Sequence, residues 1–208
     1  MNATALEHLA ASDAVMRRLI GDIGPCDLRP PRRWSPFHAL VHAVAHQQLN
    51  GTAAASILGR FRALFPDRRF PAPADLSGVS DGALRGAGFS RAKIAALRDL
   101  ACKCLEGLVP APREMAAWTD EDIITRLTAV KGVGRWTAQM LLMFQMGRPD
   151  VLPADDFGVR NGFRIAYRRR QMPTPRQLLS RGEVWRPHRT TAAWYLWRAA
   201  DRAKDKVM

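Results

Sequence analysis

The sequence predicts an all-α protein, and three observations support this fold class. Apolar residues recur at helical spacing, for example at Ile94, Leu97 and Leu100. The alternation of β-branched and polar residues that is typical of strands is missing. Proline follows a hydroxyl residue at the start of two periodic segments, at Ser35 and Thr174, a pair that is favoured at helix N-termini.

Each expected helix begins at a residue whose side-chain oxygen can accept a hydrogen bond from a free N–H group of the first turn. In chain order these residues are Ser35, Asn50, Ser90, Thr119, Thr174 and either Thr190 or Thr191. The connections at 66–73 and 109–113 are rich in proline and short, so we expect them to lie within one compact body.

The chain is strongly basic, with 32 Lys plus Arg against 19 Asp plus Glu and a formal net charge of +13. This excess favours a polyanionic partner, and arginine, which supplies most of it, suits bidentate contacts with phosphate. The alternative is a source whose proteins are basic in general. With 208 residues and 47% hydrophobic content, the chain can bury the core of one domain or of two closely fused lobes.

The sequence carries no sign of a membrane segment or a disulfide framework. No apolar run has membrane-spanning length, and the N-terminus lacks the order of a signal peptide, so we expect a cytoplasmic, intracellular protein. Cys26, Cys102 and Cys104 are too few and too scattered for disulfides, and no four-cysteine cluster exists. We therefore expect buried or half-buried thiols and no iron–sulfur cluster.

Gly132-Val133-Gly134 separates two helical segments and predicts a hairpin between them. Gly132 can adopt the left-handed conformation that ends the first helix, and Gly134 permits a close approach of another chain. The free N–H groups of the second helix then form an anion site, with Lys131 and Arg135 beside it. The alternative is a tight helix–helix turn with no ligand.

Several segments in collinear order resemble one enzyme family. They are Gly132-Val133-Gly134-Arg135-Trp136-Thr137-Ala138, then Leu152-Pro153-Ala154-Asp155-Asp156, then Trp185-Arg186-Pro187-His188-Arg189 with Trp197, together with residues 46–55 and 88–93. They resemble the helix-hairpin-helix (HhH-GPD) DNA glycosylase superfamily, and within it the alkylation-repair branch of DNA-3-methyladenine glycosylase II (AlkA-like) enzymes. The likeness spans roughly residues 12 to 202 and is nearer to compact members that lack an N-terminal β domain.

This resemblance implies a fold and a reaction. The fold is a single HhH-GPD domain over residues 1–208 with two closely packed helical lobes, approximately residues 30–130 and residues 1–29 plus 131–208, and a DNA-binding cleft between them. The reaction is monofunctional hydrolysis of the N-glycosidic bond of alkylated purines, of the 3-methyladenine and 7-methylguanine type, after the base is flipped out of the duplex. The implied partner is double-stranded DNA with alkylated bases, bound by a nucleoid-associated monomer.

Asp156 matches the catalytic aspartate of the family. A carboxylate about 4 Å from the positive charge that develops on the sugar contributes roughly 4 kcal/mol, or about a thousandfold in rate, at an effective dielectric constant near 20. The alternative is that Asp155 and Asp156 only cap a helix. With the resemblance, we assign Asp155 to the cap and Asp156 to catalysis.

The resemblance also assigns the residues around the reacting base. Trp136, Phe157 and Trp197 match aromatic positions of the base pocket, and Met140 stands where a close relative has tyrosine. Large aromatic residues on helices are otherwise more often part of a core. Trp136 occupies the position of the lysine that forms a Schiff base in bifunctional members, so we expect no AP-lyase activity.

Two further features are implied by the resemblance alone. The turn Gln47-Gln48-Leu49 is expected to fill the gap left by the flipped base, with Gln48 or Leu49 as the inserted residue, or else to be a plain loop. The carbonyl groups of Thr128, Val130 and Gly132 are expected to hold a structural cation (Na, K or Mg), with no cofactor required for the reaction.

Two alternatives to an enzyme stay open at this stage. One is a protein of the same fold that binds damaged or bent DNA without excising bases, which would have no use for the carboxylate of Asp156. The other is a helical adaptor that uses its hairpin for protein contact, which the net charge of +13 disfavours.

Overall fold

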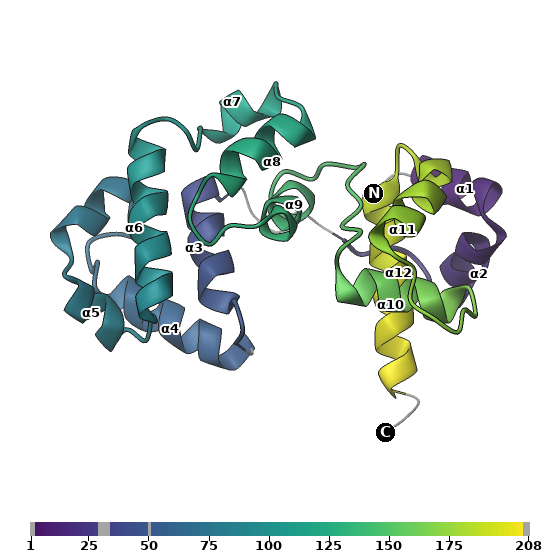
Figure 1. The fold of residues 1–208 in the computed structure, drawn as a ribbon, viewed down its shortest axis with the longest axis horizontal. Helices are drawn as coiled ribbons and strands as arrows, with labels where there is room; N and C mark the ends of the chain where they lie inside the picture. The colour runs from purple at the N-terminus through teal and green to yellow at the C-terminus, as the bar shows by residue number, and fades with distance from the viewer. Residues whose placement is uncertain (1–2, 29–33, 50, 206–208) are drawn as a thin grey trace. The chain divides into compact units, whose positions relative to one another are not determined.

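The computed structural model describes residues 3–28, 34–49 and 51–205, and within them the chain forms helices and no strands. The prediction of an all-α protein is confirmed. The chain divides into two compact units, one made of Met1–Pro31 and Leu142–Met208 and the other of Arg32–Leu141. Unit 1 and unit 2 are named here in that order, and Figure 1 labels their helices.

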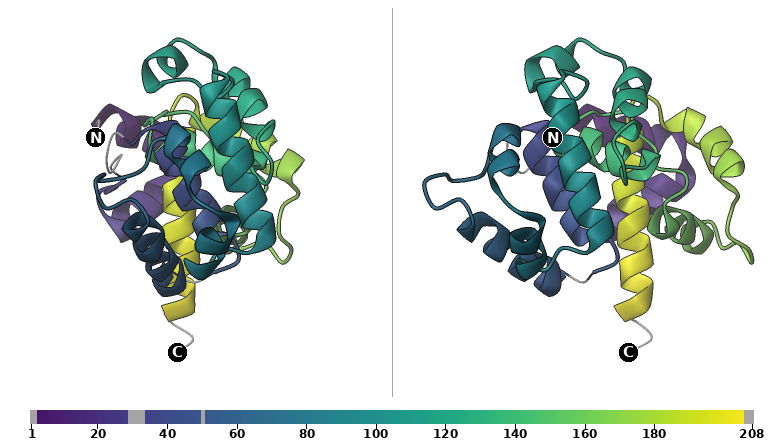
Figure 2. Two further views of the ribbon diagram at one scale, coloured as in Figure 1. Left: turned by 90° about the vertical axis from the view of Figure 1, so that its left-hand side faces the viewer. Right: turned by 60° about the vertical axis from the view of Figure 1, so that its left-hand side comes forward.

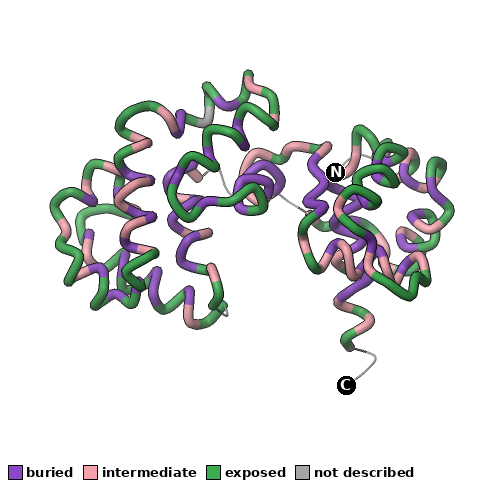
Figure 3. The backbone as a smooth tube through the Cα atoms, viewed as in Figure 1, coloured by how far each residue is buried: buried purple, intermediate pink, exposed green. Residues whose placement is uncertain are grey.

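Unit 2 is built around two long helices that lie side by side, α3 and α6 (Figures 1 and 2). Its helices are α3 (Pro36–His46), α4 (Gly51–Ala63), η1 (Pro73–Gly78), α5 (Asp81–Gly86), α6 (Arg91–Leu105), α7 (Pro112–Ala116), α8 (Asp120–Thr128) and most of α9 (Arg135–Phe144). Wholly buried residues on both long helices, such as Leu40 and Val44 on α3 and Leu97 and Leu100 on α6, form the core (Figure 3). Each buried leucine stabilises the unit by roughly 1.5–3 kcal/mol before the entropy cost.

Unit 1 contains α1 (Ala3–Ser12), α2 (Ala14–Ile23), α10 (Phe157–Ala166), α11 (Pro175–Gly182), η2 (Glu183–Trp185) and α12 (Arg189–Asp205). The packing of α10 on α12 is its most extensive contact. At this crossing Gly162 lies directly against the α12 backbone, because a Cβ atom there would be 1.8 Å from the carbonyl oxygen of Leu196. The glycine therefore fixes how closely the helix that begins at Asp156 approaches the helix that carries Trp197.

Most of the predicted helix starts are confirmed. The side chains of Ser35, Ser90, Thr119 and Thr174 accept hydrogen bonds from the first turns of α3, α6, α8 and α11. Asn50, the predicted start of the second helix, lies outside the described residues.

The predicted start of the last helix at Thr190 or Thr191 is wrong, because α12 begins at Arg189. The Thr190 hydroxyl donates to the Arg148 carbonyl at 2.6 Å and accepts from the Val151 N–H at 3.0 Å. The Thr190 hydroxyl therefore joins the segment from Arg148 to Val151 to the first turn of α12 and does not cap the helix.

The division into units differs from the predicted lobes at one boundary. The prediction ended the central lobe at residue 130, whereas the structure includes the hairpin and extends unit 2 to Leu141. The hairpin is bonded to unit 2, since the Lys131 N–H donates to Asp99 Oδ2 at 2.6 Å and Gln47 Nε2 donates to the Gly132 carbonyl at 2.8 Å. These contacts were not evident from the sequence because their partners are remote in the chain.

The structure also tests the expected burial of the cysteines and the expected lack of a membrane-spanning segment. All three cysteines are free; Cys26 is buried and Cys104 half-buried, but Cys102 is exposed, so the expectation of burial is wrong for that residue. Cys102 falls on the solvent side of α6, away from the face that packs on α3. Within the described part of the chain, no helix is both long enough and apolar enough to cross a bilayer.

Candidate functional site

The predicted catalytic aspartate stands at the N-terminus of α10 in unit 1. The buried residues Leu152, Pro153 and Ala154 lead to it, and its own N–H donates to the Pro153 carbonyl at 3.0 Å. Asp156 Oδ1 accepts a hydrogen bond from the Val159 N–H at 2.8 Å, which makes Asp156 the N-cap of α10.

The assignment of the cap to Asp155 is therefore wrong, and Asp155 lies exposed. Both aspartates have a side chain that suits an N-cap, and only the backbone decides between them. Asp156 has the extended conformation of an N-cap, with φ −65° and ψ 126°, and the helix begins at the next residue.

A second donor reaches the same carboxylate oxygen. Trp197 Nε1, on α12, donates to Asp156 Oδ1 at 2.8 Å, and Phe144 stacks against the Trp197 ring with 5.9 Å between ring centroids. Two N–H groups directed at one oxygen fix the orientation of the carboxylate, and the partial positive charge at the helix N-terminus favours its negative charge.

Gly158 makes this arrangement possible, and the sequence analysis missed it. A Cβ atom at Gly158 would lie 2.8 Å from Trp197 Cδ1, so the indole would have to move, and 3.1 Å from Asp156 Oδ1, which would crowd the carboxylate. A glycine in the first turn of a helix, two residues after the expected catalytic acid, is a poor helix former. A glycine at a helical position next to the expected catalytic acid was the signal in the sequence that could have identified Gly158.

The predicted base-pocket residues fall in both units. In unit 1, Phe157 follows Asp156 directly and is 65% exposed, while Trp197 is half-buried beside the carboxylate. In unit 2, Trp136 is 47% exposed on the first turn of α9, and Met140 is half-buried one turn later. Exposed aromatic rings of this size are unusual on helices that otherwise bury their apolar residues.

The predicted hairpin is present between α8 and α9. Gly132 has φ 76°, a left-handed conformation, and Val133 is buried beneath the turn. Gly134 comes directly before α9, which begins at Arg135, and the N-terminus of a helix favours an anion. The local geometry of an anion site therefore follows from the two glycines.

Charged side chains surround this hairpin. Burial would raise the pKa of the Asp99 carboxyl, but hydrogen bonds from the Lys103 side chain and the Lys131 N–H, with the charges of both lysines, lower it overall. The Lys131 side chain is exposed, whereas the Arg135 guanidinium pairs with Glu121, with 3.0 Å between Nη1 and Oε2. The arginine must leave this exposed pair to bind a phosphate, at a cost of less than about 1 kcal/mol.

The turn that was expected to enter DNA presents two of its residues to solvent. Gln48 has φ 58° and is exposed, and Leu49 is 40% exposed. Gln47 is only half-exposed, since its amide reaches back to the Gly132 carbonyl. The choice between Gln48 and Leu49 as the inserted residue stays open.

Two of the three carbonyl groups that the resemblance assigns to a cation already accept a hydrogen bond. The Val130 oxygen accepts from the Val133 N–H at 3.0 Å, and the Gly132 oxygen accepts from Gln47 Nε2 at 2.8 Å. Each oxygen keeps a second lone pair, but an N–H donor places partial positive charge beside the position that a cation would take. The structural cation at Thr128, Val130 and Gly132 stays a prediction.

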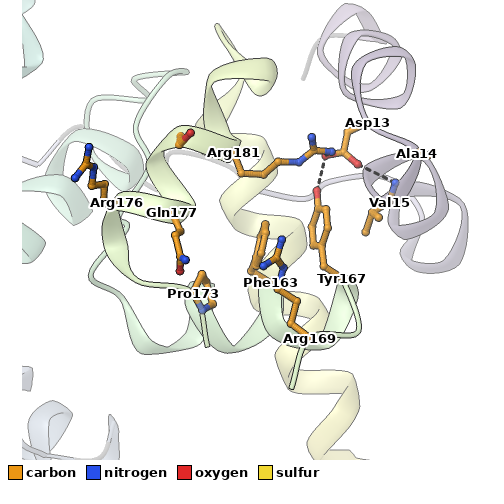
Figure 4. A pocket seen from close by; sticks show the side chains of 11 residues that line it. Asp13, Ala14, Val15, Phe163, Tyr167, Arg169, Pro173, Arg176, Gln177 and Arg181 are labelled. Atoms are coloured by element: carbon orange, nitrogen blue, oxygen red, sulfur yellow. Dashed lines mark hydrogen bonds and ion pairs between the residues drawn. The ribbon is translucent and has the colours of Figure 1, made fainter. Parts of the chain in front are cut away.

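A buried carboxylate in unit 1, that of Asp13, has a structural role. Asp13 lines a cavity of about 800 Å³ together with Tyr167 and Arg181 (Figure 4). It accepts hydrogen bonds from the Tyr167 hydroxyl, from Arg181 at 2.6 Å and from Trp185 Nε1 at 3.0 Å. Burial opposes ionisation of Asp13, but the hydrogen bonds from Tyr167, Trp185 and Val15 and the charge of Arg181 outweigh it and lower its pKa. Asp13 thus caps α2 and joins it to the segments that follow α10.

The comparison with protein families decides the assignment of the fold. Residues 41–187 match the family model described as HhH-GPD superfamily base excision DNA repair protein. The chain belongs to the HhH-GPD superfamily. The matched segment contains the hairpin and the start of α10, so the superfamily is recognised through the parts that carry the candidate site.

Individual HhH-GPD proteins resemble the chain over nearly all of its length. DNA-3-methyladenine glycosylase 1 of Schizosaccharomyces pombe is 39% identical over 94% of this chain and 86% of its own. The solved structure of the S. pombe 3-methyladenine DNA glycosylase Mag1 in complex with abasic DNA matches with a TM-score of 0.83 over 94% of this chain and 96% of that one. A DNA-3-methyladenine glycosidase from Bacillus halodurans matches with a TM-score of 0.89 at 33% identity, over 99% and 93% of the two chains.

Proposed function

We propose that this protein is a base-excision-repair DNA glycosylase that hydrolyses the N-glycosidic bond of alkylated purines. The observation that carries the proposal is the carboxylate of Asp156, held through Oδ1 by the Val159 N–H and the Trp197 indole at 2.8 Å each. Membership of the HhH-GPD superfamily and the 39% identity to a 3-methyladenine glycosylase support the same function. The abasic DNA bound to Mag1 is the kind of product that such a reaction leaves.

The chemistry requires little beyond a fixed negative charge. An N-alkylated purine is already cationic, so it leaves with the electron pair of the glycosidic bond and becomes neutral. Positive charge then develops on the sugar, where Asp156 stabilises it by roughly 4 kcal/mol. Water adds to the anomeric carbon and loses a proton, which Asp156 or solvent accepts.

The base is inaccessible while it is stacked in the duplex, so the protein must hold it outside. Aromatic rings attract an electron-poor purine by stacking and by cation–π interaction, and Phe157 and Trp197 present such rings next to the acid. The hairpin N–H groups and Lys131 would hold a phosphate during this step. Gln48 or Leu49 would occupy the place of the displaced base.

The test is release of 3-methyladenine and 7-methylguanine from methylated duplex DNA by the wild type and by Asp156→Asn. We expect the substitution to lower the rate about a thousandfold, since the amide keeps the shape of the side chain but loses its charge. Asp155→Asn is the matched control, because Asp155 is an exposed neighbour outside the cap, and it should release base at the wild-type rate.

Two results would contradict the proposal. One is full activity of Asp156→Asn. The other is tight binding of methylated DNA by the wild type with no release of any alkylated base, which would identify a damage-binding protein without catalysis.

A further inference from the structure

Unit 2 contains a cavity of about 1030 Å³ that plays no part in the function proposed above. It opens between α3, α4 and the segment after α4, and its distinctive lining residues are Trp34, His38, His42, Arg62, Arg69 and Phe70. Pockets that bind small ligands usually measure about 300–1,000 Å³, so the volume suits one.

Flat rings form one wall of the cavity. The His38 imidazole stacks on Trp34 with 4.3 Å between ring centroids and on Phe70 with 3.5 Å, at interplanar angles of 12° and 16°. Two rings that are each parallel to His38 at these distances must lie on its opposite faces. Trp34, His38 and Phe70 are all only half-buried, so the stack keeps aromatic surface for another flat ring.

The histidines of this wall are neutral near pH 7 and can form further hydrogen bonds. Burial, together with the neighbouring imidazoles and Arg62, lowers the pKa of both His38 and His42 to about 4. A neutral imidazole offers one N–H donor and one acceptor nitrogen. Within the described residues, no protein group bonds to the ring nitrogens of His38 or His42, so these polar edges are available to a ligand.

The cavity also contains positive charge without a counter-ion. Arg62 and Arg69 are exposed, and neither pairs with a carboxylate among the described residues, whereas the adjacent Arg68 pairs with Asp75 at 2.9 Å. Among the described residues, none that lines the cavity is acidic. Unpaired guanidinium groups beside an aromatic wall favour an aromatic anion.

The same residues disfavour a metal ion, although His38, His42 and His46 recur at one-turn spacing on α3. His46 Nδ1 is engaged with the His42 carbonyl at 2.9 Å, and Arg62 and Arg69 would repel a cation. No cluster of three or more metal-ligating side chains occurs within residues 3–28, 34–49 and 51–205.

We propose that this cavity binds a nucleotide. Its base stacks on the outer face at one end of the Trp34–His38–Phe70 stack, its edge bonds to an imidazole, and Arg62 and Arg69 hold the phosphate. The nucleotide has two sources with the same chemistry, a free nucleoside monophosphate or a nucleotide of a single DNA strand. The site does not depend on Asp156, which belongs to unit 1.

The test is calorimetric titration of the full-length protein with AMP, adenosine and inorganic phosphate. We expect AMP to bind at least about tenfold more tightly than adenosine, because adenosine lacks the charged contacts, and inorganic phosphate to bind too weakly to detect. The double variant Arg62→Ala/Arg69→Ala should weaken AMP binding about a hundredfold, as expected for two charged hydrogen bonds.

The matched control is Arg85→Ala/Arg91→Ala, which removes two exposed arginines of the same unit that do not line the cavity. It should bind AMP like the wild type. Equal weakening in the two double variants, binding of phosphate as tight as that of AMP, or no binding of AMP at millimolar concentration would each overturn the proposal.

Competition separates the two sources of nucleotide. Displacement of AMP by a 5′-phosphorylated single-stranded oligodeoxynucleotide supports a site for a DNA strand, and the absence of displacement supports a site for the free nucleotide. Asp156→Asn, which should release base about a thousandfold more slowly than the wild type, should bind AMP normally. Loss of the proposed catalytic function and loss of this site are therefore distinguishable.

Discussion

The indole nitrogen of Trp197 and the carboxylate of Asp156, which are 41 residues apart in the chain, are joined by a hydrogen bond of 2.8 Å. The oxygen that accepts it also caps α10, so one atom of Asp156 is held from two helices. Trp197 was assigned from the sequence to the base pocket alone. The structure adds a positioning role, because the indole sets the direction of the acid.

Replacing Trp197 with Phe should lower the rate of base release about tenfold to a hundredfold. Phenylalanine keeps the aromatic surface but removes the N–H donor, and a hydrogen bond to a charged group contributes roughly 1.5–3 kcal/mol. The fall should appear in kcat more than in KM, and Asp156→Asn/Trp197→Phe should be no slower than Asp156→Asn alone. Trp194→Phe on the same helix is the control, and equal losses in both tryptophan variants would contradict a positioning role.

Gly158→Ala should reduce activity while the protein stays folded. The new methyl group would meet Trp197 Cδ1 at 2.8 Å and displace the ring or the Asp156 side chain. Gly21→Ala on α2 is the control, since a Cβ there has no neighbour within 4 Å, and it should stabilise the protein by about 0.5–1 kcal/mol. Base release and urea unfolding of both variants check this prediction, and unchanged activity of Gly158→Ala would count against the tight Gly158–Trp197 contact.

Asp13→Asn should lower the free energy of unfolding by roughly 1.5–3 kcal/mol at pH 7, because it weakens the hydrogen bonds that Tyr167, Trp185 and the exposed Arg181 make to a buried charge. The pKa of Asp13 is lower in the folded protein than its usual value of 3.8. Its contribution is therefore complete above the unfolded pKa and is lost as the pH falls through the folded pKa. Urea unfolding of wild type and variant at pH 7 and below about pH 4 should show the difference shrinking in acid, and a constant difference would exclude this linkage.

Borohydride should trap no covalent adduct between the protein and DNA that contains an alkylated base. Trp136 lacks the amine that a Schiff base requires, and Lys131 precedes the hairpin rather than standing at the matching position. The reaction is checked on a denaturing gel, with an abasic duplex and a known lyase as the positive control. A borohydride-dependent band with this protein would show that another amine reacts with the sugar.

The elements with local signals could be predicted from the sequence. Ser35, Ser90, Thr119 and Thr174 begin helices as their sequences indicate. Gly132 has the predicted left-handed conformation, but the helix it was expected to end already stops at Thr128. A helix cap depends on a few consecutive residues, so the local sequence is sufficient to predict it. The α10 cap, which falls on Asp156 and not on Asp155, shows the limit, because a shift of one residue changes neither composition nor period.

The parts that could not be predicted depend on residues far apart in the chain. Asp13 meets Tyr167, Arg181 and Trp185 at separations of 154, 168 and 172 residues, and no local pattern encodes those contacts. Gly158 and Gly162 are required because the Trp197 side chain and the Leu196 backbone of α12 lie against them, and these contacts are seen only in the folded unit. The stack of Trp34, His38 and Phe70 likewise becomes visible only when the segment after α4 lies against α3.

The hydrogen bond from Gln47 to the Gly132 carbonyl has a consequence for the order of events at DNA. It links the turn expected to enter the duplex to the hairpin expected to hold the backbone, so their spacing is set before any DNA is bound. Pre-organisation of this kind reduces the conformational entropy that association must remove. A DNA strand bound by the hairpin would therefore find Gln48 and Leu49 at a fixed distance from the bound phosphate.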